Sequence, residues 1–259
     1  MQDGEIIEDR ILDDIVRSYA SKRLVTLRSF SDDWVHHLTS DSGELWLSGY
    51  KTSLNNSAAG AIAQDKVATY ELLTTHDIAA VPHYLYRHSL SEQSARALSN
   101  QRIVTKPLTG TSGRGIKLHH NLVEARLYMD QHPDSWAVSP YVEIHSETRV
   151  IVLDGKIILS FDKSGAVRHD DGLVLFNLSH GGTPQVRSLE DNESEIAVRA
   201  QSALGLSLCA VDIVSTPQGK FVLEVNDGFM LEHFMRVSEE YRQLGTEAYE
   251  TIFDSRLFT

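Results

Sequence analysis

Apolar and polar residues alternate along this chain in patterns that predict a mixture of helices and strands. Residues 6–19 place apolar side chains at intervals of three and four, the spacing of an amphipathic helix. Two short apolar runs, at 23–27 and 43–50, lie between polar segments and predict strands in a small N-terminal unit. A second helix is predicted from Asp65, and Pro82 prevents it from continuing.

The remaining chain alternates apolar runs of strand length with amphipathic stretches of helix length. An Asp-Gly pair at 154–155 sits between two apolar runs and predicts a hairpin turn. The predicted strands are 102–107, 116–120, 136–143, the hairpin 148–163, 208–215 and 220–226, and the predicted helices are 122–132, 193–205 and one or more within 232–253. Antiparallel hairpins mixed with helices indicate an α+β fold.

Composition narrows the class of protein. The 259 residues are 41% hydrophobic, enough for a sizeable core, and the formal charge of −12 disfavours general binding to nucleic acid or anionic membranes. No run approaches the about 18 apolar residues that span a bilayer, so we expect a cytoplasmic protein.

The single cysteine, Cys209, is interpreted as a packing residue. The histidine pairs at 36–37 and 119–120 lack metal-binding spacing and are interpreted as surface or turn residues.

The strand 220–226 carries polar side chains that an apolar strand rarely tolerates. Glu224 and Asn226 are two residues apart and therefore face the same side. A turn signal at 216–219 predicts that this strand pairs antiparallel with the preceding one, which places Asp212 roughly opposite Glu224. Two carboxylates and an amide are ligands that suit Mg²⁺. The alternative is the solvent-facing side of a half-buried hairpin.

A lysine and a glycine-rich segment lie upstream of this hairpin. Lys106 ends an apolar strand and precedes a loop with Gly110, Gly113 and Gly115. Glycines let backbone N–H groups approach phosphate oxygens, and a lysine supplies a positive charge. The segment is neither a P-loop nor a dinucleotide fingerprint, because no Gly-Lys-Ser/Thr follows and the loop leads into a strand. A plain glycine-rich hairpin turn is the alternative.

Six segments in order resemble the ATP-grasp superfamily, most closely its ribosomal-protein glutamate ligases and related peptide ligases. They are DK at 65–66, TKPLTGTSGRG at 105–115, ETR at 147–149, FNLSHGG at 176–182, AVDIV at 210–214 and LEVN at 223–226. The resemblance spans residues 57–245. It implies two α+β subdomains enclosing a nucleotide, at 65–140 and 141–259, preceded by a short N-terminal unit at 1–64.

The resemblance also implies roles for particular residues. Lys66 and Lys106 would contact ATP phosphates, and the loop with Gly110, Thr111, Ser112, Gly113 and Gly115 would close over them. Asp212, Glu224 and Asn226 would hold one or two Mg²⁺ ions, with Mn²⁺ as an alternative. Arg149 would stabilise the γ-phosphate or an acyl-phosphate, Glu147 would accept from the ribose hydroxyls, and Asn177 would lie near the reacting phosphate. Otherwise Lys66 is a helix-surface lysine, Arg149 forms a surface ion pair and Asn177 caps a turn.

Some segments depart from the family pattern. Ser139 and Pro140 replace polar side chains in the hinge that faces adenine, and Pro140 has no N–H to donate. Adenine would then be held mainly by main-chain groups around Tyr141 and Val142. The segment DGFMLEHF after Asn226 replaces the usual border of the acceptor pocket, so the family's substrate does not carry over.

The implied activity is ATP-dependent joining of a carboxylate and an amine through an acyl-phosphate, releasing ADP and phosphate. The partners would be small-molecule or peptide substrates, and a homodimer is expected. Arg168, His169 and Arg236 are candidates to bind substrate carboxylates. Two alternatives stay open: a catalytically silent nucleotide-binding regulator, and a phosphotransferase acting on a hydroxyl group.

Overall fold

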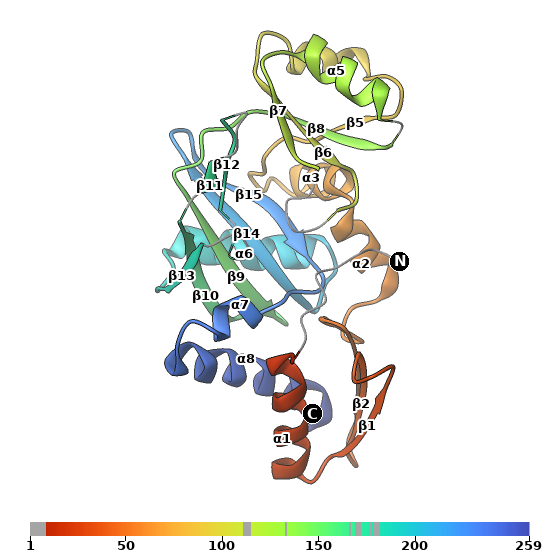
Figure 1. Ribbon diagram of the computed structural model, residues 1–259, viewed down its shortest axis with the longest axis vertical. Coiled ribbons are helices and arrows are strands. Elements are labelled where there is room, and N and C mark those ends of the chain that lie inside the picture. The colour runs from red at the N-terminus through yellow and green to blue at the C-terminus, as the bar shows by residue number, and fades with distance from the viewer. Residues whose placement is uncertain are drawn as a thin grey trace.

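Three antiparallel sheets follow one another along the long axis of the protein (Figure 1). The computed structural model describes residues 9–110, 115–132, 134–165, 167–168, 172–176, 178 and 182–258, with only the backbone of 167, 168 and 175. A small pair, β11 (Val167–Arg168) and β12 (Val174–Leu175), lies outside the three sheets. In the described part of the chain no helix combines the length and apolarity needed to cross a membrane.

The N-terminal sheet follows the first helix. Its elements are α1 (Ile11–Arg23), β1 (Thr26–Phe30), β2 (Val35–Thr39), β3 (Glu44–Ser48) and β4 (Lys51–Thr52), with the strands in sequential order. β2 was not predicted, because its two histidines resemble a polar linker. His36 is buried and bonds Asp13 at 2.9 Å. His119 is also buried, 2.9 Å from the Thr105 hydroxyl, so the surface interpretation was wrong for both.

A second sheet forms the opposite end of the molecule. Its strand order is β5-β8-β6-β7, and its core holds Leu98, Ile103, Met129 and Trp136. In the sequence, α2 (Ser57–Gln64) and α3 (Lys66–Thr75) precede this sheet and pack against the central sheet. The elements of this region are β5 (Tyr84–Tyr86), α4 (Glu92–Ala97), β6 (Ile103–Pro107), β7 (Lys117–His119), α5 (Leu122–Gln131) and β8 (Trp136–Pro140). The helix from Asp65 is confirmed as α3, with Asp65 accepting from the N–H groups of Val67 and Ala68.

The central sheet has five strands in the order β13-β10-β9-β14-β15. Its elements are β9 (Ser146–Leu153), β10 (Lys156–Ser164), β13 (Thr183–Val186), α6 (Asp191–Ala203), β14 (Leu208–Thr216) and β15 (Gly219–Asn226). The Asp-Gly hairpin is confirmed: Asp154 and Gly155 both have positive φ, at 44° and 77°. The predicted pairing of Asp212 with Glu224 is confirmed residue for residue.

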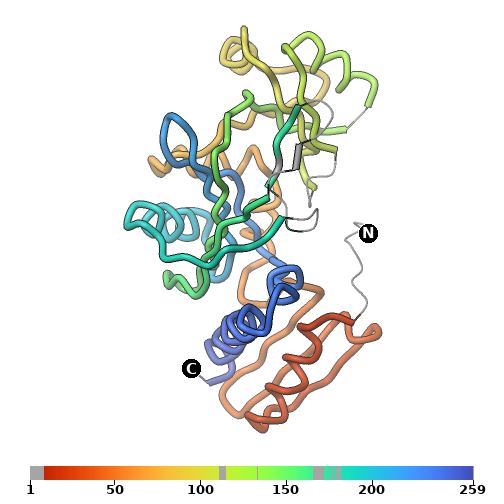
Figure 2. The backbone as a smooth tube through the Cα atoms, turned by 60° about the vertical axis from the view of Figure 1, so that its left-hand side comes forward, coloured from red at the N-terminus to blue at the C-terminus, as the bar shows by residue number. Residues whose placement is uncertain are grey.

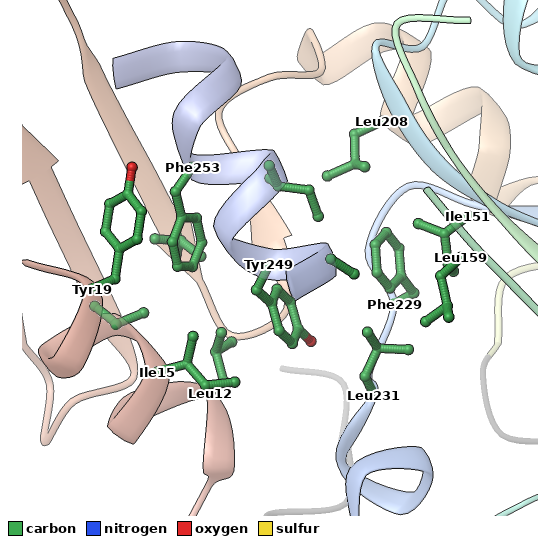
Figure 3. Packing of buried hydrophobic residues seen from close by; sticks show 14 of the residues in the cluster. Leu12, Ile15, Tyr19, Ile151, Leu159, Leu208, Phe229, Leu231, Tyr249 and Phe253 are labelled. Atoms are coloured by element: carbon green, nitrogen blue, oxygen red, sulfur yellow. The ribbon is translucent and has the colours of Figure 1, made fainter. Parts of the chain in front are cut away.

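Helices cover both faces of the central sheet. One face packs Val150 and Val211 against α6 and against α2 and α3. The other packs Ile151 and Leu208 against α8 (Glu239–Leu257) and α1, with Phe229 and Leu231 filling the space beside α7 (Glu232–Met235) (Figure 3). In Figure 2, α8 and α1 lie side by side at the same end of the molecule.

A buried carboxylate joins the C-terminal helices to the N-terminal one. Glu232 is 0% exposed and accepts from the N–H groups of Ile11 and Leu12 at 3.0 and 3.2 Å. These are unpaired donors of the first turn of α1, where a negative charge is favourable. Glu232 therefore fixes α1, and with it the N-terminal sheet, against the central sheet.

Replacing Glu232 with alanine is expected to lower the free energy of unfolding by about 3 kcal/mol, because two buried N–H groups lose their acceptor. Urea denaturation measures this change. Glu195→Ala is the control, since Glu195 forms an exposed ion pair with Arg199 at 3.4 Å, and its loss should cost less than about 1 kcal/mol. Equal effects of the two variants would contradict the capping role.

Candidate active site

One face of the central sheet changes from apolar to charged along its strands. Beyond the apolar residues that contact α8, β9 places Arg149 and Glu147 on this face, β10 places Lys163 and β14 places Asp212. The register aligns Arg149 with Asp212 and Glu147 with Lys163. Opposite charges on neighbouring strands can pair directly in this arrangement. The register of the strands therefore brings these charged side chains together on one face.

Asp212 is the negative centre of this face. Arg149 donates from Nε and Nη2 to its two oxygens at 2.8 and 2.7 Å, and Lys163 Nζ lies 3.0 Å from Oδ2. Burial alone would raise the pKa of Asp212, but the charges of Arg149 and Lys163 outweigh it and hold the pKa well below its usual range. Asp212 is therefore ionised, yet it is 0% exposed beneath its two cations.

Lys163 is a site residue that the sequence analysis missed. Its ammonium group contacts both Asp212 and Glu147, and its side chain is buried. Burial raises the pKa of Glu147 to about 6, although Lys163 opposes this shift. The observed partner of Glu147 is Lys163, within the charged cluster. Its contact with ribose stays a prediction.

Glu224 and Asn226 lie beside Asp212. Asn226 Nδ2 is 3.3 Å from Glu224 Oε1 and 3.5 Å from Asp212 Oδ2, so the three predicted metal ligands converge. Among the described residues, no group of three or more His, Cys, Asp or Glu residues is arranged to hold a metal ion. Two carboxylates with an amide oxygen nevertheless fit Mg²⁺ by their chemistry. Asp212 could become a ligand only if Arg149 and Lys163 move away from it.

Lys106 reaches the site from the end of β6 and is positioned by His83. The Nδ1 atom of His83 is 2.8 Å from the Val81 carbonyl, so this nitrogen carries the proton and donates. The other ring nitrogen, Nε2, is then an acceptor, and Lys106 Nζ donates to it at 3.2 Å. Val81 is in turn bonded to Val222 of β15 at 2.9 Å. His83, which no sequence signal indicated, therefore holds the lysine of one sheet at a fixed place beside the strand that carries Glu224.

Burial lowers the pKa of Lys106 to about 8, with Glu224 opposing this shift and Lys66 adding to it. The pKa of His83 lies well below its usual value, chiefly because of burial and then because of Lys106. Neutral His83 can accept from Lys106, and Lys106 keeps its positive charge below about pH 8.

Replacing His83 with leucine is expected to raise the KM for ATP about tenfold or more with a smaller change in kcat, because a hydrogen bond to a charged group is lost. Steady-state kinetics measure both constants. His83→Gln should recover part of the affinity by restoring an acceptor. His132→Leu is the control, because His132 bonds the Tyr128 carbonyl at 2.7 Å on the distant helix α5. An unchanged KM in His83→Leu would refute the positioning role.

The second lysine, Lys66, begins α3 and donates to the carbonyl of Gly110 at 3.0 Å. Burial lowers its pKa, and Glu224 opposes this shift. This contact holds the start of the glycine-rich loop near the charged face. Thr111, Ser112 and Gly113 lie outside the described residues, and Gly115, beyond them, has a φ of +71°, which favours glycine.

The hinge after β8 closes the apolar end of the site. The N–H of Tyr141 is already bonded to the Arg102 carbonyl at 2.8 Å, and the Arg102 guanidinium lies 4.5 Å above the Tyr141 ring. Among the described hydrogen bonds none uses the N–H of Val142. Val142 therefore keeps a main-chain donor at the hinge that a ligand can use, and its contact with adenine stays a prediction.

A cavity of about 440 Å³ joins these parts. Its walls hold Lys66, Lys106, Gly110, Tyr141, Val142, Glu147, Arg149, Lys163, Glu224 and Asn226. Its apolar end is lined by Val104, Ile116, Ile144, Leu173 and Leu223. The cavity thus combines an apolar end with a charged end, an arrangement that suits a nucleotide.

Several predicted residues cannot be placed in this cavity. Asn177 and His169 lie outside the described residues, as does the side chain of Arg168. Arg236 is half-exposed, donates to the Asp9 carbonyl at 2.8 Å and contacts Glu232 at 3.4 Å. Cys209 is buried, and burial raises the pKa of its thiol to about 12, which confirms its interpretation as a packing residue.

Comparison with known proteins decides the family. The model of the RimK-like ATP-grasp domain matches residues 63–244, most of the chain. The chain belongs to this family. It is 30% identical over 190 residues to a probable alpha-L-glutamate ligase of Mannheimia succiniciproducens, covering 71% of this chain and 62% of that protein. It is 28% identical over 187 residues to a protein of the same description in Syntrophotalea carbinolica, covering 70% of this chain and 60% of that protein. The chain thus spans less than two thirds of the length of these relatives.

Solved structures confirm the ATP-grasp fold. D-alanine–D-alanine ligase from Bacillus anthracis complexed with ATP is similar with a TM-score of 0.59 and 17% identity, over 78% of this chain and 70% of that one. A bifunctional glutathione synthetase from Pasteurella multocida has a TM-score of 0.59 at 14% identity, over 86% of this chain and 40% of that one. The ATP-grasp ligase PsnB, solved with a minimal precursor, Mg and ADP, has a TM-score of 0.52 at 16% identity, over 76% of this chain and 62% of that one.

Proposed function

We propose that this protein is an ATP-dependent carboxylate-amine ligase that forms an amide bond through an acyl-phosphate. The observation that carries the proposal is a single cavity in which Arg149, Lys106 and Lys163 lie beside Glu224 and Asn226. Cations and hard oxygen donors at one end of an apolar nucleotide-sized cavity suit phosphoryl transfer. Membership of the RimK-like ATP-grasp domain family supports the same reaction class.

ATP is a substrate in this proposal. Its adenine would occupy the apolar end near Val142, and its phosphates would lie between Lys66, Lys106 and the glycine-rich loop. A carboxylate is a poor electrophile because oxide would have to leave, so its oxygen first attacks the γ-phosphorus and displaces ADP. The amine then attacks the acyl carbon, a C–N bond forms, phosphate leaves and the amine loses a proton.

The chain's charges serve the first of these steps. Glu224, Asn226 and Asp212 would hold Mg²⁺, which when bound would supply positive charge that favours phosphoryl transfer. Arg149 and Lys163 now neutralise Asp212. Both also line the cavity, where they would bring positive charge to the transferred phosphoryl group, which is the charge stabilisation that phosphoryl transfer needs.

The experiment that tests the proposal is a panel of amino acids and short peptides offered as acid and as amine with Mg²⁺-ATP. ADP and phosphate release and the product mass are measured, with Glu224→Gln as the inactive control. Release that needs both partners and yields an amide supports the ligase. A phosphate ester would show a phosphotransferase instead, and ATP binding without turnover would favour a silent regulator.

A further inference from the structure

The N-terminal sheet forms one wall of the same cavity. It contributes Trp34, Ser48, Gly49, Tyr50 and Lys51, whereas the central sheet contributes Arg149, Glu224 and Asn226. The nucleotide end lies toward the hinge at Tyr141 and Val142. The N-terminal wall is therefore the part of the cavity left for the group that reacts with ATP.

Two aromatic rings dominate this wall, and a buried arginine fixes them. The Arg10 guanidinium lies 4.7 Å above the Trp34 ring and 5.6 Å above the Tyr50 ring, and the two rings meet edge to face at 6.4 Å. Arg10 is anchored by Asp13 at 2.6 Å and by the Gly49 carbonyl at 3.3 Å. Cation–π contacts of a desolvated arginine hold aromatic rings in place. Trp34 and Tyr50 form what we call the aromatic wall.

Gly49 helps to fix the position of the Trp34 ring. Its φ is +59°, and a Cβ atom there would come within 2.7 Å of Trp34 Cζ2. Its N–H also bonds the Trp34 carbonyl at 2.9 Å. The Trp34 ring thus lies in a space that only glycine leaves open, and the residue as a whole is still 40% exposed.

Among the described residues, the remaining surface at this end offers apolar side chains and a lysine that is already paired. Phe229 and Met230, from the segment that follows Asn226, line the same cavity. Among the described residues of the N-terminal sheet that line the cavity, Lys51 is the only charged one. Its ammonium group already donates to the two carboxylate oxygens of Asp227 at 3.0 and 2.7 Å. A substrate with a second carboxylate, such as glutamate, finds no unpaired cation on this wall among the described residues, whereas an apolar side chain finds aromatic surface.

We propose that the aromatic wall binds an apolar or aromatic side chain of the amino acid or peptide that is joined, and so selects against glutamate. This inference rests on the ligase function proposed above, and it makes Trp34 a specificity-determining residue. Aromatic side chains at a wall of this kind supply large contact area at low cost in conformational entropy.

The test compares phenylalanine, leucine and glutamate, free and as dipeptides with alanine, in the ADP-release assay. Wild-type protein should use the phenylalanine or leucine compounds at least about tenfold better, by kcat/KM, than the glutamate ones. Trp34→Ala should raise the KM for the preferred compound about tenfold and leave the KM for ATP unchanged, and Trp34→Phe should restore most of the affinity.

The matched control is Trp46→Ala. Trp46 belongs to the same sheet and is also 40% exposed, but it stacks on His37 at 3.9 Å and is absent from the cavity lining. Glutamate used as well as the apolar compounds, or equal effects of Trp34→Ala and Trp46→Ala, would overturn the inference while leaving the ligase function intact.

Absence of ADP release with every compound would instead count against the ligase function. Calorimetric binding of the phenylalanine and glutamate dipeptides, in the presence of a non-hydrolysable ATP analogue, then decides the inference separately. Binding of the phenylalanine dipeptide that is lost in Trp34→Ala supports the aromatic wall. No binding, or equal binding by both proteins, refutes it.

Discussion

Replacing Arg149 with methionine is expected to lower kcat by about three orders of magnitude, the effect typical of an arginine that stabilises a transferring phosphoryl group. Arg149 lines the cavity and donates to both oxygens of Asp212. Without it, Lys163 alone would balance the buried Asp212 and Glu147 carboxylates. We also expect a loss of about 3 kcal/mol in the free energy of unfolding, because a buried ion pair is broken.

Measuring kcat per folded protein separates these two effects, with folding followed by circular dichroism and urea denaturation. Arg187→Met is the matched control. Arg187 binds Asp162 at 2.8 and 2.9 Å and Glu193 at 2.8 and 2.7 Å, but it is absent from the cavity lining. It should lose stability and keep its turnover. If Arg149→Met retained wild-type kcat, Arg149 could not be the group that stabilises the phosphoryl transfer.

Replacing Lys106 with methionine is expected to raise the KM for ATP about 100-fold, because a buried charge that would face the phosphates is removed. In the wild-type protein, kcat/KM for ATP should fall as the pH rises through about 8, the value to which burial lowers the Lys106 pKa. The sign follows from the charge: above this pKa the side chain is a neutral amine and attracts phosphate less.

A pH series of kcat/KM for ATP measures this dependence. Lys117→Met is the control, since Lys117 lies on the neighbouring strand β7, over the Tyr128 ring at 4.6 Å, and is exposed. It should behave like the wild type. Retention of the fall near pH 8 in Lys106→Met would assign the titration to another group.

The parts of the site that depend on neighbouring residues in the chain could be predicted from the sequence. A turn signal and the two-residue period of a strand were enough to place Asp212 opposite Glu224 with Asn226 on the same side. The Asp-Gly pair fixed the β9–β10 hairpin for the same reason. The order of six short motifs then indicated the ATP-grasp fold, which the family match and the solved structures confirm.

Contacts between distant segments were not predictable in this way. Lys163 reaches Asp212 only because β9 brings β10 and β14 into one sheet, and within the sequence it is one lysine at the end of a hairpin. His83 contacts Lys106, which lies 23 residues further along the chain. The aromatic wall depends on Arg10, which comes from the start of the described chain. Single-strand patterns carry no information on such pairs. The division at residues 64 and 140 and the homodimer stay predictions.

The central claim is that ATP activates a carboxylate as an acyl-phosphate in this cavity. The most direct test uses the acid that the substrate panel identifies, labelled with ¹⁸O in its carboxylate, and analyses the phosphate released in one turnover by mass spectrometry. The account predicts that one ¹⁸O atom moves from the acid to the phosphate. Release of phosphate without label, alongside formation of the same amide, would contradict it.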